Sequence, residues 1–203
     1  MQEHNRASQW FNELYKKHEN SHENIPWARQ KVNPLLQTYL DNDDEEHKGK
    51  ALVIGCGLGD DAYALDNAGY NVVAIDVSQK ALDLAQKRFS NSSIHFEKQD
   101  IFDMPQQYYE NFDFIFEAFT IQSLPIEFRE KMIHAVVNTV ARNGKLLVVA
   151  HKRNSNNDGP PWPLTHNEIS LFKTNGMKEL SFELINETSK ISNVKFRVLY
   201  IKP

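Results

Sequence analysis

Apolar and polar positions follow two different periods along most of this chain. Short apolar runs predict strands at residues 52–54, 71–75, 94–97, 112–117 and 145–150. Between them, apolar residues at helical spacing predict helices over residues 60–68, 78–89 and 125–140. Because strands and helices alternate from Lys50 onward, the pattern predicts a parallel sheet with helices on both faces.

Both ends of the chain depart from this alternation. Strands predicted at residues 177–184 and 194–202 have no helix between them, so we expect an antiparallel hairpin. Thr165 and Glu168 have the spacing of a capping box, which predicts a helix before that hairpin. Residues 8–20 and the segment from Pro34 to Leu40 read as helices of an N-terminal cap, followed by a solvated linker from Asp41 to Lys50.

The predicted architecture is a single α/β domain over residues 1–203. A helical cap (1–48) precedes a Rossmann-like, doubly wound core (49–203) of seven mostly parallel strands that ends in an antiparallel hairpin. A chain of 203 residues is long enough to bury a substantial core in one domain.

Composition narrows the possible partners and the compartment. Lys plus Arg number 23 and Asp plus Glu number 27, so a net charge of −4 gives no electrostatic case for nucleic acid. No apolar run approaches the length of a membrane span, and the polar start of the chain does not read as a signal peptide. Cys56 is the single cysteine and cannot form an internal disulfide, so we expect a cytoplasmic protein.

The most informative motif is a glycine-rich turn after the first predicted core strand. Gly55, Gly57 and Gly59 alternate there, and Asp76 ends the next strand, where an acid can accept from ribose hydroxyls. A dinucleotide fingerprint has glycine at its sixth position, whereas Asp60 stands there and disfavours a pyrophosphate. S-adenosylmethionine (SAM) has no phosphate and carries a positive sulfonium, so the pattern favours SAM over NAD. A tight turn without a ligand is the remaining alternative.

Five parts of the sequence form a recognisable set: Ala51–Gly59, Gly69–Ala81, Leu124-Pro125 with Arg129, Gly159-Pro160-Pro161, and the paired Trp10 and Trp27. Together they resemble the thiopurine S-methyltransferase and thiol/halide methyltransferase group, and the resemblance covers nearly the whole chain. Two features depart from the group: Ile54 replaces its usual proline before the first glycine, and the segment Phe116–Thr120 differs from plant halide enzymes.

The resemblance implies roles for residues at the ends of the predicted strands. Asp76 would accept from the ribose hydroxyls, with helix capping as its structural alternative. Asp100 would meet the adenine amino group and Ile101 would pack on the ring, unless Asp100 is only a loop cap. Glu117 would bind the methionine ammonium, border the acceptor, or form an ion pair at a strand end.

Aromatic residues complete the candidate site. Trp10 and Trp27 would face the sulfonium, since cation–π attraction is worth roughly 0.5–2 kcal/mol, or would pack the cap onto the sheet. Trp162 is a candidate for the acceptor pocket. Cys56 reads as a small residue between glycines rather than a reactive thiol. The predicted cofactor-binding residues are Trp10, Trp27, Gly55, Cys56, Gly57, Gly59, Asp76, Val77, Asp100, Ile101 and Glu117.

These features predict a SAM-dependent methyltransferase that acts on a small soft nucleophile: a thiol, thiopurine, halide or metalloid oxyanion. In-line displacement from a sulfonium needs mainly alignment, so we predict no catalytic side chain and no metal ligand. His151 is a candidate base, although a histidine at such a rim is typical of the surface. The alternatives are a non-catalytic SAM-binding regulator and an NAD-dependent oxidoreductase.

Overall fold

The computed structural model describes residues 30–44, 48–153, 159–186 and 194–203. The predicted helix at residues 8–20, together with Trp10 and Trp27, lies outside the described residues. The chain divides into two compact units, the first ending at Asp100 and the second beginning at Ile101. Within the described parts of the chain, no helix combines the length and apolar character needed to cross a membrane.

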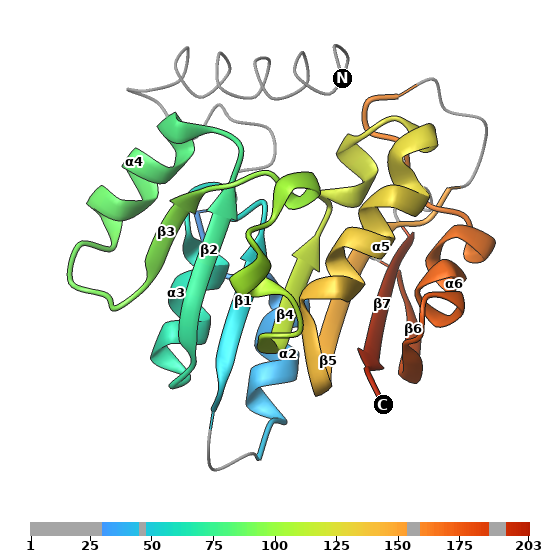
Figure 1. Ribbon diagram of the computed structural model, residues 1–203, viewed down its shortest axis with the longest axis horizontal. Coiled ribbons are helices and arrows are strands. Elements are labelled where there is room, and N and C mark those ends of the chain that lie inside the picture. The colour runs from blue at the N-terminus through green and yellow to red at the C-terminus, as the bar shows by residue number, and fades with distance from the viewer. Residues whose placement is uncertain (1–29, 45–47, 154–158, 187–193) are drawn as a thin grey trace. The chain divides into compact units, whose positions relative to one another are not determined.

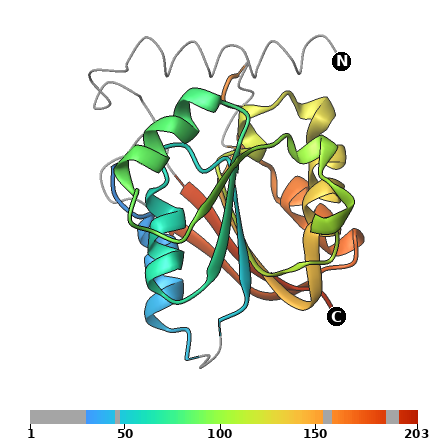
Figure 2. The ribbon, with the colours of Figure 1, turned by 60° about the vertical axis from the view of Figure 1, so that its left-hand side comes forward.

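The first unit contains parallel strands covered by helices. β1 pairs with β2, and β2 with β3, in parallel registers such as Ala51↔Val72 and Ile75↔Glu97. Helices α2, α3 and α4 lie along one side of these strands (Figure 2). The elements are α2 (Pro34–Asp41), β1 (Lys50–Ile54), α3 (Asp60–Asn67), β2 (Asn71–Asp76), α4 (Gln79–Arg88) and β3 (His95–Lys98).

The second unit combines a parallel pair with an antiparallel end. β4 pairs with β5 in parallel, while β7 runs antiparallel to both β5 and β6. Helices α5 and α6 contact each other and lie over these strands (Figure 1). The main elements are β4 (Phe112–Ala118), α5 (Arg129–Thr139), β5 (Val140–His151), α6 (His166–Thr174), β6 (Lys178–Asn186) and β7 (Val194–Ile201). Short 3₁₀ turns are η2 (Ile101–Asp103), η3 (Gln106–Tyr108), η4 (Ile121–Ser123) and η5 (Ile126–Phe128).

The strands follow the order β3-β2-β1-β4-β5-β7-β6 in a seven-stranded sheet. This order confirms the predicted Rossmann-like α/β class with its antiparallel hairpin. The apolar run in β1 explains its place inside the sheet, because Ala51 to Ile54 are all buried. A strand that is covered on both faces has no reason to alternate polar and apolar residues.

Two local predictions need correction. Asn143-Gly144 does not turn into a strand at Lys145, since β5 already begins at Val140. Phe112 pairs with Val140 and Phe114 with Lys145, so the intervening β5 residues form a bulge that absorbs the expected turn. Glycine is required there because a Cβ on Gly144 would lie 2.7 Å from the carbonyl oxygen of Phe112.

The other correction concerns the segment from Asp41 to Lys50, which is not wholly solvated. The Asp43 side chain is only 4% exposed and lies 2.8 Å from the Lys48 ammonium. Its Oδ2 also accepts a hydrogen bond of 2.8 Å from the Tyr70 hydroxyl. This acid therefore ties the segment to the residue that precedes β2.

Candidate functional site

The glycine loop after β1 is tied to the carboxyl end of β2. Gly57 has φ of +51° and its N–H donates to Oδ2 of Asp76 at 2.9 Å. Gly59, at φ +86°, is the N-cap residue of α3. A Cβ on Gly59 would lie 3.0 Å from Cβ of Ala85, so only glycine lets α3 begin this close to α4.

Asp76 is the central polar group of the first unit. It is 8% exposed, and its Oδ1 accepts from the Ser78 N–H at 2.8 Å. Burial raises the pKa of Asp76, against the opposing effect of the N–H groups of Ser78, Gly57 and Val77. Each carboxylate oxygen carries two lone pairs, so both oxygens still have capacity for a ligand hydroxyl.

The capping role considered for Asp76 belongs to its neighbour Ser78. The Ser78 hydroxyl accepts from the Ala81 N–H at 3.3 Å and starts α4. Gln99 donates its backbone N–H to the Asp76 carbonyl at 3.1 Å, which places Asp100 one residue away from this contact. The strand ends therefore bring Asp76, Asp100, Val77 and the glycine loop to one edge of the first unit.

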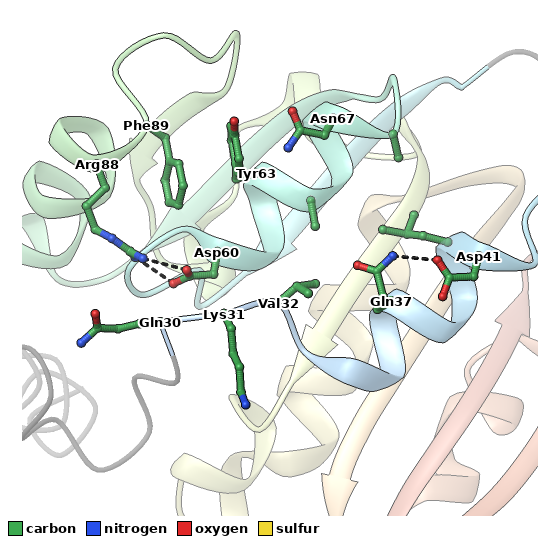
Figure 3. Close-up of a pocket in the computed structure, with 13 residues that line it drawn as sticks. Gln30, Lys31, Val32, Gln37, Asp41, Asp60, Tyr63, Asn67, Arg88 and Phe89 are labelled. Atoms are coloured by element: carbon green, nitrogen blue, oxygen red, sulfur yellow. Dashed lines mark hydrogen bonds and ion pairs between the residues drawn. The ribbon is translucent and has the colours of Figure 1, made fainter.

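Carboxylates occupy the start of α3. Asp60 and Asp61 lie in its first turn. The Arg88 guanidinium binds both oxygens of Asp60 at 2.7 Å, as Figure 3 shows, and also donates to the Leu58 carbonyl. Asp61 accepts from the Asn33 N–H at 2.6 Å. Because the chain's own acids complement this helix start, it is poorly suited to a pyrophosphate.

Cys56 is half-buried in the loop, in a setting that does not activate its thiol. Its N–H donates to the Ile75 carbonyl at 3.0 Å. Burial, followed by the negative charges of Asp76 and Asp61, raises the pKa of the thiol well above its ordinary value. The neutral thiol is not a nucleophile at physiological pH.

The first unit also has an open groove of about 690 Å³ that is distinct from the glycine loop (Figure 3). It runs between α2, α3 and the end of α4. The rings of Tyr63 and Phe89 stack there, with their centroids 4.4 Å apart. Neither Asp76 nor Gly57 lines it. We therefore do not assign the cofactor to this groove.

In the second unit, Glu117 lies near the end of β4 and is completely buried. Its Oε1 accepts from the Ile121 N–H at 2.9 Å. Its Oε2 has no hydrogen-bond partner among the described residues, and burial raises the pKa of Glu117 to about 7. The predicted strand-end ion pair is not formed within the described parts of the chain, which leaves a buried oxygen able to take a ligand.

Residues that the sequence did not single out surround this strand end. Phe119 has φ of +65°, and its ring stacks on His151 with centroids 5.0 Å apart. Gln122 is 4% exposed, and its Oε1 accepts from the His151 N–H at 2.7 Å. A positive φ at a phenylalanine costs free energy and is typical of functional sites. No pattern in the sequence predicts it.

The predicted cofactor residues divide between the two units. Ile101 opens the second unit and is 8% exposed within η2. Gly55, Cys56, Gly57, Gly59, Asp76, Val77 and Asp100 belong to the first unit, and Ile101 and Glu117 to the second. Trp10 and Trp27 are not among the described residues.

The first unit fits a nucleoside cofactor with a positive charge. Asp76 offers lone pairs for ribose hydroxyls, the glycine loop permits close approach of the backbone, and acids surround the loop. The fold is shared with the N-methyltransferase NodS from Bradyrhizobium japonicum WM9, solved in complex with S-adenosyl-L-homocysteine. The TM-score is 0.75 at 19% identity, over 94% of this chain and 98% of that one.

The Rossmann-like fold and the match to a family model together define a SAM-dependent methyltransferase. The family model of thiopurine S-methyltransferase (TPMT) matches residues 12–197. The chain belongs to this family.

Sequence relatives agree with this assignment. Thiocyanate methyltransferase 1 of Brassica oleracea is 25% identical over 175 residues, which cover 81% of this chain and 76% of that protein. Thiopurine S-methyltransferase of Legionella pneumophila (strain Corby) is 25% identical over 183 residues, or 82% and 80% of the two chains.

Proposed function

We propose that this enzyme transfers the methyl group of SAM to the sulfur atom of a small acceptor. The observation that carries the proposal is the family match over residues 12–197. The similar proteins are named for thiocyanate and thiopurine, and both of these acceptors present sulfur. Among the predicted acceptors, this favours a thiol, thiopurine or thiocyanate over a halide or a metalloid oxyanion.

Residues of the first unit, together with Ile101, which follows Asp100 in the sequence, would hold the nucleoside part of SAM. Asp76 would accept from the ribose hydroxyls while its hydrogen bonds to Gly57 and Ser78 keep the loop in place. Asp100 would face the adenine amino group and Ile101 would pack on the ring. Trp10 and Trp27 remain our candidates for contact with the sulfonium.

Glu117 has two possible roles, and both follow from its unpartnered Oε2. That oxygen would accept from the methionine ammonium of SAM or border the acceptor.

Alignment is the chief contribution that we expect from the protein. SAM supplies an activated methyl group, and the sulfur–carbon bond to the acceptor forms as the bond to the sulfonium breaks. Fixing the two partners in line is worth on the order of 7–11 kcal/mol. A thiol is already a few per cent thiolate at neutral pH, so the reaction does not depend on an added base.

The partner that we propose is a small molecule rather than a macromolecule. The net charge of −4 offers no attraction to a nucleic acid. The acids around the glycine loop disfavour an NAD pyrophosphate, so an oxidoreductase has no support from this site.

An acceptor panel tests the proposal. The purified protein is incubated with isotopically labelled SAM and thiocyanate, 6-mercaptopurine, thiophenol, iodide or arsenite, and methylated products are identified by mass spectrometry. We expect an S-methyl product from at least one sulfur acceptor, together with S-adenosylhomocysteine. Binding of SAM without any methylated product would instead indicate a regulator, and transfer to iodide or arsenite alone would refute sulfur as the acceptor.

A His151→Ala variant tests whether a base is required. We expect it to keep turnover with a thiol acceptor within about threefold of the wild type, because a thiolate needs no base. A variant that binds SAM normally but forms no product would contradict this mechanism.

A further inference from the structure

Trp162, in the loop between β5 and α6, is held by both of its backbone polar groups. Its N–H donates to the Gln122 carbonyl at 2.7 Å, and its carbonyl accepts from Nη2 of Arg129 at 2.7 Å. The indole also lies directly on Gly159, where a Cβ would come within 2.2 Å of the ring. These contacts together define the place of Trp162.

Arg129 links this loop to α6. It is 2% exposed, and its Nη1 donates to Oε1 of Glu168 at 2.8 Å. Glu168 is itself fixed, because its Oε2 accepts from the N–H and the hydroxyl of Thr165 at 2.6 Å and 2.9 Å. Arg153 adds a contact of 3.2 Å to Glu168 and donates to the Pro163 carbonyl at 3.0 Å.

Glu168 is stabilised as a carboxylate by its neighbours in this cluster. Burial alone would raise the pKa of Glu168, but the hydrogen bonds from Thr165 and the charges of Arg129 and Arg153 together lower it. Nε of Arg129 is buried without a hydrogen-bond partner among the described residues. Burying a guanidinium costs free energy, and the Nε–H of this one is also left without a partner. Such a buried polar group calls for an explanation beyond the hydrogen bonds that the side chain itself makes.

The same network reaches the carboxyl end of β4. The Ile121 N–H donates to the Glu117 side chain. The next residue, Gln122, accepts from the Trp162 N–H with its carbonyl and from the His151 N–H with its side chain. Glu117 and Trp162 are thus attached to adjacent residues of one short turn. The ends of parallel strands such as β4 and β5 form the edge at which α/β proteins bind ligands.

We propose that Arg129 is a positioning residue for the methyl acceptor. It holds Trp162 at the carboxyl ends of β4 and β5 and thereby sets the affinity for the acceptor without touching it. This inference rests on the proposed function, and it adds a residue whose side chain acts through the loop. Arginine is required because one planar guanidinium reaches Glu168 and the Trp162 carbonyl together, which a single ammonium does not reproduce.

Steady-state kinetics of Arg129→Lys test this role, with Arg197→Lys as the matched control. Arg197 is also buried and is also bound to a glutamate, Glu183, which lies on β6 rather than on α6. For Arg129→Lys we expect the acceptor KM to rise about tenfold or more, while the Kd for SAM stays within about twofold. The control should leave both values within about twofold. A parallel loss of affinity for SAM and acceptor would overturn the proposal.

A double-mutant cycle separates positioning from general destabilisation. If Arg129 acts through Trp162, Arg129→Lys should change the acceptor KM by less than about twofold in a Trp162→Ala background. Effects that multiply fully would show that Arg129 acts by another route and would refute the proposal.

A spectroscopic readout does not depend on turnover. The chain has three tryptophans, so 5-fluorotryptophan labelling gives three ¹⁹F signals, and the signal lost in Trp162→Phe identifies Trp162. Arg129→Lys should move this signal and Arg197→Lys should not. An unmoved Trp162 signal refutes the positioning role, whereas absence of product from the wild type refutes the proposed function. If Arg129→Lys does not fold, Glu168→Gln is held to the same expectations.

Discussion

Asp76 shows how one residue can organise a loop and keep capacity for a ligand. Its Oδ2 accepts from the Gly57 N–H and its Oδ1 from the Ser78 N–H, and the Val77 N–H also binds the carboxylate. One buried carboxylate therefore holds both the glycine loop and the start of α4. Removing the carboxylate would release the loop and, under the proposed function, would also remove the acceptor for the ribose hydroxyls.

Glu117 should give a clear pH signature in stability. Its folded pKa of about 7 lies above the ordinary value of 4.5, so the folded chain keeps a proton that the unfolded chain releases. Stability from this group is therefore lost as the pH rises from about 4.5 to about 7. The Glu117→Gln variant should not show this pH-dependent loss of stability, because an amide does not ionise. We expect the free energy of unfolding of the variant, relative to the wild type, to increase by on the order of 2–4 kcal/mol between about pH 4.5 and about pH 8.

Urea unfolding of both proteins at these two pH values measures the difference. Glu127→Gln is the control, because Glu127 is an exposed acid of the same unit. A Glu117→Gln difference that is independent of pH would show that the carboxyl group ionises as it does in water.

Cys56 should resist alkylation in the folded protein. Its thiol is kept protonated by burial and by the charges of Asp76 and Asp61, and only the thiolate reacts. We expect iodoacetamide to modify the native chain at least about tenfold more slowly than the urea-unfolded chain. Mass spectrometry follows the reaction at this single cysteine, and equal rates in the two states would contradict the assignment of an inert thiol.

At the residue scale, the sequence predicted what is local. Ser78 caps α4, and Thr165 with Glu168 forms the expected capping box, because these contacts span only three residues. The contact of Arg129 with Trp162 joins residues 33 positions apart, and no periodicity marks such a pair. Arg129 belongs to one of the segments that carry the family resemblance, but its contact with Trp162 could be found only from the structure.

At the scale of elements, Gly59 sets the distance between α3 and α4. A Cβ there would meet Ala85 at 3.0 Å and both Phe89 and Phe96 at 3.2 Å. Gly176 has a similar φ of +95° but nothing within 4 Å of its Cβ position. A substitution at Gly176 therefore reports the cost of the left-handed backbone alone. A substitution at Gly59 reports that cost together with the cost of steric crowding.

Both Gly→Ala substitutions should lose about 1–2 kcal/mol from the left-handed conformation. Gly59→Ala should lose about 1–3 kcal/mol more, because the methyl group is forced into packed side chains. Chemical denaturation measures both variants. Equal losses would mean that α3 and α4 move apart at little cost and that Gly59 does not hold them in register.

The elements were predictable where burial dictates the pattern. Apolar runs located β1 and β2, and the missing helix before β7 predicted the hairpin. The β5 bulge was missed because Asn143-Gly144 is a strong turn signal, whereas here φ of +62° at Asn143 is accommodated inside a strand. Pairing with β4 overrode the local preference.

For the whole molecule, charge limits the partners. A net charge of −4 should prevent appreciable binding of duplex DNA at physiological salt, because phosphate contacts supply most of such affinity. Fluorescence anisotropy with labelled DNA tests this, and we expect no change at protein concentrations on the order of 10 μM. Binding that weakens steeply as salt is raised would reveal a basic surface and contradict a small-molecule partner.

The central claim is that the glycine loop and Asp76 form a SAM site. Calorimetric titration with S-adenosylhomocysteine, with NAD as the comparison ligand, tests it most directly on wild type, Asp76→Asn and Asp83→Asn. Asp83 is the control, since it is an exposed acid of α4 whose Oδ1 accepts from the Gln79 side chain within the same helix. We predict affinity on the order of micromolar for the wild type and for Asp83→Asn, loss of binding in Asp76→Asn, and no binding of NAD. Undiminished binding by Asp76→Asn, or none by the wild type, would contradict the assignment of this site.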